Sequence, residues 1–316
     1  MTERQTERLS ARPDDLARAA EIWRAGGLVA LPTETVYGLG ADASNDLAVA
    51  RIFEAKGRPR FNPLIVHVAT PEDAQALTLW DDRAERLAQA FWPGPLTLVL
   101  PLRPGAPVSK LVTAGLDTLA VRCPAHPVAQ AALSTFGGGI AAPSANRSGK
   151  LSPTSAAHVL AGLDGRIDAV IEAGASEIGL ESTILGLAGP ATLLRDGAIT
   201  AEMLAQALGE EVLSRAANAA ISAPGQLASH YAPRAAMRLD ATDWQEGEAT
   251  LGFGEVTADL NLSPAGDLRE AAANLFEYLH RLDAGGAARI AVSPIPRKGL
   301  GLAINDRLSR AAAPRD

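Results

Sequence analysis

The stretch LVALPTETVYGLG, residues 28–40, passes from an apolar run into a polar segment with two glycines. Residues 28–31 have the pattern of a short strand that is buried on both faces. Residues 32–40 then bring together two threonines, a carboxylate and a phenol beside glycines, which permit close approach of a ligand or a second backbone. We expect a strand followed by a tight loop. A turn with solvated polar side chains is the alternative interpretation of this stretch alone.

Helix and strand patterns alternate outward from this stretch. Helix-start chemistry occurs at Pro13–Asp14–Asp15, Ser44–Asn45–Asp46 and Thr70–Pro71, each followed by apolar residues at helical spacing or by a helix-compatible segment. Strand patterns recur at 64–68, 96–100, 118–122, 140–142, 169–172, 182–185 and 192–194. Strands interleaved with helices predict an α/β fold in which helices cover a twisted, mixed sheet.

The regular alternation lapses in residues 216–236, which turn to Ala, Ser, Pro and Gly in the manner of a linker. Strand patterns then return at 249–253 and 288–292, and helix patterns at 267–282 and 301–312. These elements predict a second, smaller α/β domain. The expected organisation is a large catalytic domain over 1–212, a linker over 213–236 and a small domain over 237–316.

Composition excludes several classes of protein and site. Of the 316 residues, one is cysteine, so Cys123 can form neither an intrachain disulfide nor part of a multi-cysteine zinc site. The formal net charge of −7 argues against nucleic-acid binding through a global positive field. There is no P-loop, dinucleotide fingerprint, G-x-S-x-G elbow or H-E-x-x-H motif. Without a signal peptide or a long apolar run, we expect a cytoplasmic protein.

Five further polar clusters follow in the chain, at 56–64 (KGRPRFNPL), 141–149 (AAPSANRSG), 181–184 (ESTI), 193–197 (LLRDG) and 224–233, which contains PGQ and HYAP. The cations of 56–64 surround a proline-stiffened loop. Because arginine and lysine neutralise phosphate charge, this loop is a candidate cradle for a triphosphate. A basic surface loop is the alternative.

In this order and spacing, the six clusters resemble the L-threonylcarbamoyladenylate synthase family in its two-domain form. The most specific parts are residues 32–40, the Lys-x-Arg before Asn-Pro-Leu at 56–64, Pro-Ser-Ala-Asn at 143–146, His-Tyr-Ala-Pro at 230–233 and GLGLAINDRL at 299–308. The resemblance implies a catalytic domain with a positively charged concave face. It also implies a nucleotidyltransferase that makes threonylcarbamoyl-AMP from L-threonine, bicarbonate and ATP, releasing pyrophosphate, for the threonylcarbamoyladenosine modification of tRNA.

The resemblance also implies two sets of binding residues. Those expected to contact threonine are Thr35, His67, Arg122, the backbone of Ala142, and Ser182. Those expected to contact ATP are Arg58, Asn62, Thr118, Ser144, Ser152, Arg195 and Tyr231. Lys56 and Arg58 are the catalytic candidates, and no residue is identified as a general base. We expect Mg²⁺ to be held through ATP, because no acidic cluster is set aside for a metal.

Two other functions remain open at this point. One is a carbamoyl-transferring maturation factor that shares the domain, although the fused zinc modules of such proteins need more cysteines. The other is an RNA-binding module that uses a basic concave face. We further expect the linker to be a lid whose Tyr231 reaches the nucleotide, with the small domain anchoring its far end. The activated product would be passed to a complex that acts on tRNA, and direct tRNA binding would be weak.

Overall fold

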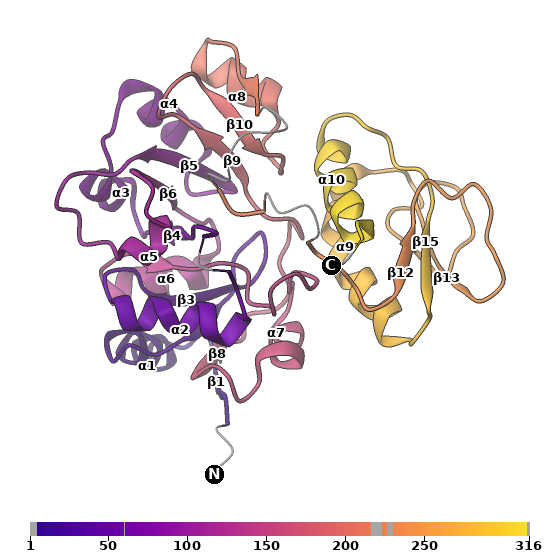
Figure 1. The fold of residues 1–316 in the computed structure, drawn as a ribbon, viewed down its shortest axis with the longest axis horizontal. Coiled ribbons are helices and arrows are strands. Elements are labelled where there is room, and N and C mark those ends of the chain that lie inside the picture. The colour runs from indigo at the N-terminus through magenta and orange to yellow at the C-terminus, as the bar shows by residue number, and fades with distance from the viewer. Residues whose placement is uncertain (1–4, 60, 216–222, 226–229, 315–316) are drawn as a thin grey trace.

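The computed structural model describes residues 5–59, 61–215, 223–225 and 230–314. Two lobes of unequal size lie side by side (Figure 1). The large lobe contains one 11-stranded sheet and the small lobe a separate 4-stranded sheet. The smaller lobe turns its two helices toward the larger lobe and its sheet away from it (Figure 1). This is the α/β architecture with a second, smaller α/β domain that the sequence predicted.

The strands of the large sheet lie in the order β1 (Glu7–Leu9), β8 (Ala169–Ile171), β2 (Val29–Leu31), β3 (Gly38–Asp42), β7 (Ile140–Ala141), β4 (Ile65–His67), β6 (Thr118–Arg122), β5 (Leu96–Pro101), β9 (Thr183–Gly186), β10 (Thr192–Arg195) and β11 (Leu213–Ser214). Pairing is mixed, as expected: β4 and β6 are parallel, whereas β5 and β6 are antiparallel. The helices of this lobe are α1 (Pro13–Arg24), α2 (Asp46–Lys56), α3 (Pro71–Leu77), α4 (Asp82–Phe91), α5 (Lys110–Thr113), α6 (Pro127–Phe136), α7 (Ala156–Leu163) and α8 (Ala201–Leu208).

Helix starts follow the capping chemistry read from the sequence. The side chain of Asn45 accepts hydrogen bonds from the first backbone N–H groups of α2. Thr70 forms a capping box with Asp73, and Pro71 takes the first position of α3. These side chains satisfy backbone donors that the helix cannot satisfy by itself, which is why both helices begin where they do.

The two faces of the sheet are covered differently. Because successive strand residues point to opposite faces, Val66, Val121 and Leu98 lie in the main core with α2, α3, α4 and α8. On the opposite face, α1 and α6 cover the half built from β1, β8, β2 and β7. On the other half of that face, Ile65 and Ile184 pack with Ala223 of the linker segment. No helix residue belongs to this cluster of described residues. The polar side chains of the site gather on this half of the face.

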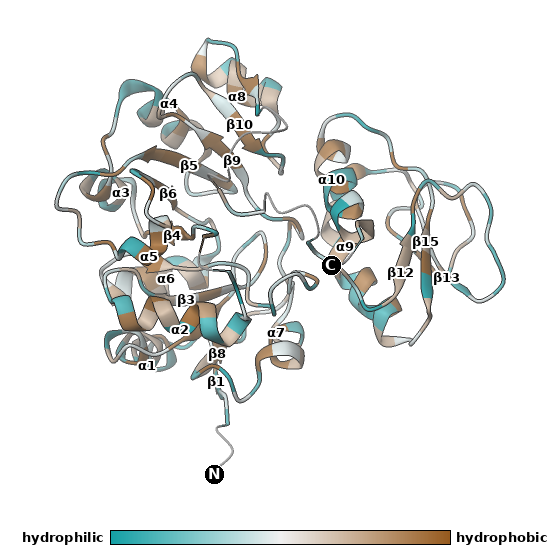
Figure 2. Ribbon diagram, in the orientation of Figure 1, coloured by the Kyte–Doolittle hydropathy of each residue, from teal (hydrophilic) through white to brown (hydrophobic). Residues whose placement is uncertain are grey.

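The small lobe contains β12 (Ala236–Arg238), β15 (Arg289–Val292), β13 (Glu248–Gly252) and β14 (Leu260–Asn261), in that order, with every neighbouring pair parallel. Helices α9 (Leu268–Ala284) and α10 (Leu300–Ala312) pack on it. Figure 2 shows apolar residues concentrated along the strands of both lobes and polar residues on the outer loops. The part of the chain that the structure describes contains no helix with the length and apolarity needed to cross a membrane.

One sequence expectation is wrong in its detail. Residues 38–40, expected in a loop, form β3 in the middle of the sheet, between β2 and β7. Gly40 is needed there because a Cβ would lie 2.8 Å from Cγ2 of Ile140 and 3.1 Å from Nε1 of Trp23, which donates to the Gly40 carbonyl. The glycines that suggested a loop therefore serve close packing within a strand.

A segment of the chain connects the two sheets. The large sheet continues through β11 to Ser214, and the small sheet begins at Ala236. Of this segment the structure describes Arg215, residues 223–225 and residues 230–235. The domain boundaries themselves stay a prediction.

We predict that Gly197→Ala destabilises the large domain by about 1–3 kcal/mol, the usual range for an overpacked site. An added Cβ would lie 2.4 Å from the backbone nitrogen of Thr183 and 2.8 Å from the carbonyl carbon of Ser182. Urea unfolding measures the change. Gly189→Ala is the matched control, because nothing lies within 4 Å of its added Cβ. Equal stabilities for the two variants would contradict the prediction.

Candidate functional site

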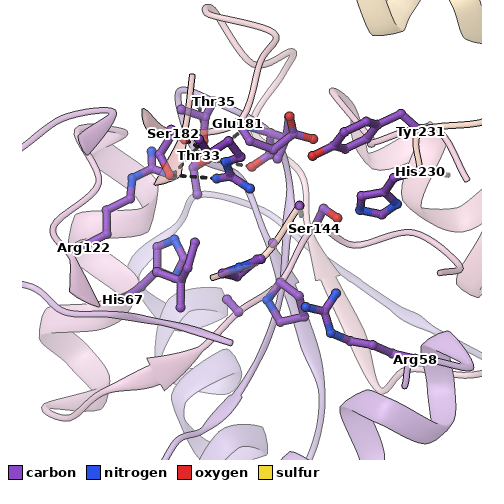
Figure 3. Close-up of a pocket in the computed structure, with 18 residues that line it drawn as sticks. Thr33, Thr35, Arg58, His67, Arg122, Ser144, Glu181, Ser182, His230 and Tyr231 are labelled. Carbon is purple, nitrogen blue, oxygen red and sulfur yellow. Dashed lines mark hydrogen bonds between the residues drawn. The ribbon is translucent and has the colours of Figure 1, made fainter. Parts of the chain in front are cut away.

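A cavity lies on the half-face described above, between the sheet and the linker segment (Figure 3). Nine of the residues expected to bind substrates line it: Thr35, Arg58, His67, Arg122, Ala142, Ser144, Ser182, Arg195 and Tyr231. They come from segments more than 190 positions apart in the chain. The sheet topology is what brings them together.

Strand register places His67 and Arg122 side by side at the ends of β4 and β6. Arg122 is 3% exposed, and its guanidinium is fixed from three directions. Nε donates to the carbonyl of Gly94 at 3.1 Å, Nη1 to the hydroxyl of Thr35 at 2.8 Å, and Nη2 to Oε1 of Glu34 at 2.6 Å. A guanidinium has five N–H groups, so two remain for a ligand in the cavity.

Glu34 makes a buried ion pair with Arg122 that the sequence analysis did not foresee. Its second oxygen, Oε2, is buried and has no hydrogen-bond partner among the described residues. Thr35 is oriented from its other side by Thr33, whose Oγ1 lies 2.8 Å from Oγ1 of Thr35 and donates to the carbonyl of Val36 at 2.6 Å. Arg122 therefore lies in a rigid, preorganised polar environment.

His67 is neutral in this environment. Burial, together with the nearby charge of Arg122, lowers the pKa of its imidazole to about 3. Its Nδ1 is buried and has no partner among the described residues. Figure 3 shows the ring on the same side of the cavity as Arg122. The arrangement offers a bound ligand a neutral hydrogen-bonding group beside a fixed cation.

Ser182 and Arg195 also line the cavity and are hydrogen-bonded to each other. The Ser182 hydroxyl lies 2.7 Å from the hydroxyl of Thr97 and accepts from Nη2 of Arg195 at 3.1 Å. Nε of Arg195 donates to the Ser182 carbonyl at 3.0 Å. Burial lowers the pKa of Arg195, but the group remains a cation near neutral pH.

The loop 56–64 brings two more cations inward. Nη2 of Arg58 donates to the carbonyl of Pro63 at 3.0 Å, and Nε to that of Asn62 at 3.4 Å. Burial lowers the pKa of Arg58 to about 10, which leaves it charged at neutral pH. Lys56 does not line the cavity. Its Nζ donates to the carbonyls of Ser144 and Asn146, so it holds the 143–146 loop in place.

Three residues expected at ATP lie outside the cavity lining. Asn62 is 1% exposed, and its Oδ1 has no partner among the described residues. Ser152 is fully buried and donates its hydroxyl to Oε1 of Glu181. Thr118 shares the face of Arg122 four positions away, about 13 Å along an extended strand. These three assignments stay predictions.

The linker segment covers the cavity with Gly225, His230 and Tyr231. Tyr231 has a φ of 62°, a left-handed conformation that is costly for an aromatic residue. It is held there by contact of its ring with His230, at 4.1 Å between centroids, and with Phe276 of α9, at 5.6 Å. A Cβ on Gly225 would lie 3.0 Å from the Tyr231 hydroxyl, so only glycine lets the two parts of the segment meet.

Sequence reasoning missed several lining residues. Thr33, Glu181, Pro224, Gly225 and His230 stood in the quoted clusters but were not assigned to a substrate. The polar clusters indicated where in the chain these residues lie. They did not indicate what each residue does, because that depends on partners remote in sequence. Within the described ranges, no group of three or more His, Cys, Asp or Glu side chains could hold a metal ion.

Comparison with known proteins gives matches along nearly the whole chain. A family model described as "Telomere recombination" matches residues 21–197. A second model, described as "Threonylcarbamoyl-AMP synthase, C-terminal domain", matches residues 199–313. The two models match consecutive parts of the chain. The boundary between them lies just after β10 of the large sheet.

Curated relatives match at similar coverage. The chain is 43% identical to threonylcarbamoyl-AMP synthase of Pyrococcus abyssi, over 93% of this chain and 93% of the relative. It is 42% identical to the Bacillus subtilis protein of the same name, over 98% and 96%. The crystal structure of P. abyssi Sua5 complexed with L-threonine superposes with a TM-score of 0.88, at 40% identity and 97% coverage of both chains.

We predict that His67 makes the protein acid-sensitive. Its folded pKa, about 3, lies below the ordinary value of 6.5, so between these values only the unfolded chain takes up the proton. Stability therefore falls as the pH drops below 6.5. From pH 7 to pH 5 this one group removes about 2 kcal/mol. In urea unfolding at the two pH values, His67→Gln should lose that much less than the unsubstituted protein. An identical loss in both would refute the prediction.

Proposed function

This chain belongs to the threonylcarbamoyl-AMP synthase family, and we propose that it joins L-threonine, bicarbonate and ATP into threonylcarbamoyl-AMP with release of pyrophosphate. The observation that carries the proposal is the cavity lined by buried cations. It places Arg122 and His67 at one side and Arg58 and Ser144 toward the other (Figure 3), and Arg195 adds a third buried guanidinium to its lining. One side suits a small amino acid, and the other suits phosphates.

Threonine would lie against the wall built by β4 and β6. The two N–H groups left on Arg122 can donate to the α-carboxylate, because a fixed guanidinium recognises a carboxylate by paired hydrogen bonds. Thr35, Ser182 and the neutral His67 supply short polar partners for the hydroxyl and the amine. Because the imidazole is neutral, it does not repel the ammonium group of threonine before that group loses its proton.

The reaction has two balanced steps. The threonine amine attacks bicarbonate, an N–C bond forms, and water leaves to give the carbamate. A carbamate oxygen then attacks the α-phosphorus of ATP, and the bond to pyrophosphate breaks. Arg58 and Arg195 would stabilise the negative charge that develops on the phosphate oxygens. Mg²⁺ would be held mainly through ATP, where it would compensate phosphate charge.

Placement and charge carry the chemistry in this proposal, and no residue is assigned as a general base. Reactants held together in a dry cavity gain the advantage of proximity, and charge stabilisation is stronger there than in water. A closed cavity also protects the product, a mixed anhydride that water would hydrolyse.

The RNA-binding alternative is weakened by burial of the cations. Arg58, Arg122 and Arg195 are each at most 9% exposed, and a phosphate backbone cannot reach buried guanidinium groups. The maturation-factor alternative is weakened by the match of relatives over more than nine-tenths of this chain, under the name threonylcarbamoyl-AMP synthase. In this proposal the enzyme works in the cytoplasm. Its product would be passed to a separate complex that carries out the threonylcarbamoyladenosine modification of tRNA.

The direct test supplies purified protein with ATP, bicarbonate and labelled threonine. Threonylcarbamoyl-AMP and pyrophosphate should form in equal amounts, and omission of any one substrate should abolish both. Pyrophosphate release that does not depend on threonine, or adenylation of threonine at its carboxylate, would overturn the proposal.

Arg122→Lys should raise the KM for threonine about tenfold or more and leave the KM for ATP nearly unchanged. Lysine keeps the charge opposite Glu34 but loses the planar pair of donors that a carboxylate accepts. Initial rates with each substrate varied in turn provide the measurement. A threonine KM equal to that of the unsubstituted enzyme would remove Arg122 from this role.

Tyr231→Ala tests whether the linker is a lid. Loss of the ring should raise the KM for ATP about tenfold and increase the ratio of pyrophosphate released to product recovered, because water would reach the anhydride. Tyr278→Ala is the control, since Tyr278 lies on α9 and does not line the cavity. Two results together would contradict the lid. One is an unchanged ratio of pyrophosphate to product in Tyr231→Ala, and the other is proteolysis within 213–236 at the same rate with and without ATP and threonine.

A further inference from the structure

One charged side chain of the small domain lies at the border of the cavity. Arg307, on α10, donates from Nε to Oε2 of Glu181 at 2.9 Å, and the two side chains are only 1% and 7% exposed. Glu181 lines the cavity. The pair therefore joins the small domain to a residue that faces the substrates, across 126 positions of sequence.

Arg307 makes further contacts that fix its direction. Nη1 donates to Asp306 at 3.0 Å, and the guanidinium carbon lies 5.6 Å from the centroid of the Tyr231 ring. Nη2 is buried and without a partner among the described residues. Because the guanidinium of Arg307 is buried, its position is set by the side chains packed around it.

Ser152 is linked to the small domain through its hydroxyl, by way of Glu181, and directly through its carbonyl. Its hydroxyl donates to Oε1 of Glu181, whose other oxygen accepts from Arg307. Its carbonyl lies 3.1 Å from Nε2 of His280, on α9. The ring of His280 is in turn stacked on His158 of α7, with centroids 3.8 Å apart. Two independent contacts thus connect the small domain to one residue of the expected nucleotide site.

The charge on Glu181 decides what this network does. Burial raises the pKa of a carboxyl group, but the charges of Arg307 and Arg195 outweigh it at Glu181 and lower its pKa, so it is ionised at neutral pH. Without Arg307, the Glu181 carboxylate would lose its ion-pair partner and place more negative charge where a triphosphate is expected to bind, with Arg195 left as the nearby cation. It would also be a buried ion without its partner, which is costly to the site around it.

We propose that Arg307 is a positioning residue for the nucleotide: it neutralises Glu181 and fixes the Glu181–Ser152 pair, so that the small domain takes part in ATP binding. The inference rests on the proposed function and assigns the small domain more than the anchoring of a lid. Arg307 acts through Glu181 and Ser152 and does not itself line the cavity.

The test uses full-length protein with Arg307→Met, Glu181→Gln and the double variant. Removing one partner of a buried pair is far more damaging than removing both. Arg307→Met should therefore weaken ATP binding in calorimetry and raise the KM for ATP, each by about tenfold or more, while the KM for threonine stays within about twofold. The double variant should restore ATP affinity to within about threefold of the unsubstituted protein.

Arg297→Met is the matched control, because Arg297 makes an exposed ion pair with Asp240 inside the same domain. Its ATP affinity should not change. Melting temperatures of all variants separate loss of binding from loss of fold. If Arg307→Met does not fold, the double variant decides: normal ATP affinity supports the inference, and affinity reduced tenfold overturns it.

Two other results would overturn the inference: normal ATP affinity in Arg307→Met, or failure of Glu181→Gln to restore the affinity that Arg307→Met loses. Failure of the proposed function has a different signature. Unsubstituted protein that binds ATP but forms no threonylcarbamoyl-AMP would remove the reaction, whereas the comparison of ATP affinities would still decide the role of Arg307.

Discussion

Burial of positive charge is the constraint on which the rest of this structure depends. Lys56, Arg58, Arg122 and Arg195 are all at most 9% exposed. A buried cation without acceptors costs several kcal/mol, so each must meet oxygen atoms of the chain. Backbone carbonyls of the loops around the cavity supply most of them, and Glu34 and Glu181 supply the negative charge. The paths of those loops are therefore set by the cations they enclose, and the loops in turn fix the cations toward the ligand.

The parts of the fold that could be predicted have strong local patterns. The apolar runs at 64–68, 96–100 and 118–122 became strands because each fills a sheet buried on both faces. β3 was missed because its glycines, which sequence reasoning associates with loops, are required by the packing of Ile140 and Trp23. β1, β11, β12 and β14 were not predicted, because these short strands are largely exposed or half-buried and have no continuous apolar run. Their existence depends on pairing with distant strands, which no local pattern contains.

The site divides in the same way. His67 and Arg122 could be named from their motifs, since each stands at the end of a predicted strand, but their adjacency follows only from the register of β4 and β6. The motif placed Arg122 opposite a threonine carboxylate, but it did not indicate that Glu34 forms an ion pair with Arg122. The role of Glu181 was beyond reach, because its partner Arg307 lies in another domain. Residue types and motifs thus indicate which groups take part, whereas long-range pairing decides what each group can do.

The two domains meet where the proposed reaction most needs enclosure. The sheet of the large domain forms the floor of the cavity, and Gly225, His230 and Tyr231 form its roof. Tyr231 packs on Phe276, so the roof is joined to the small domain by an aromatic contact as well as by the chain itself. Any movement that admits ATP must separate such contacts, and its free energy lowers the apparent affinity by the same amount. Stability of the domain interface and affinity for the nucleotide are therefore opposed: a tighter interface protects a water-sensitive product better, and it also makes the cavity harder to enter.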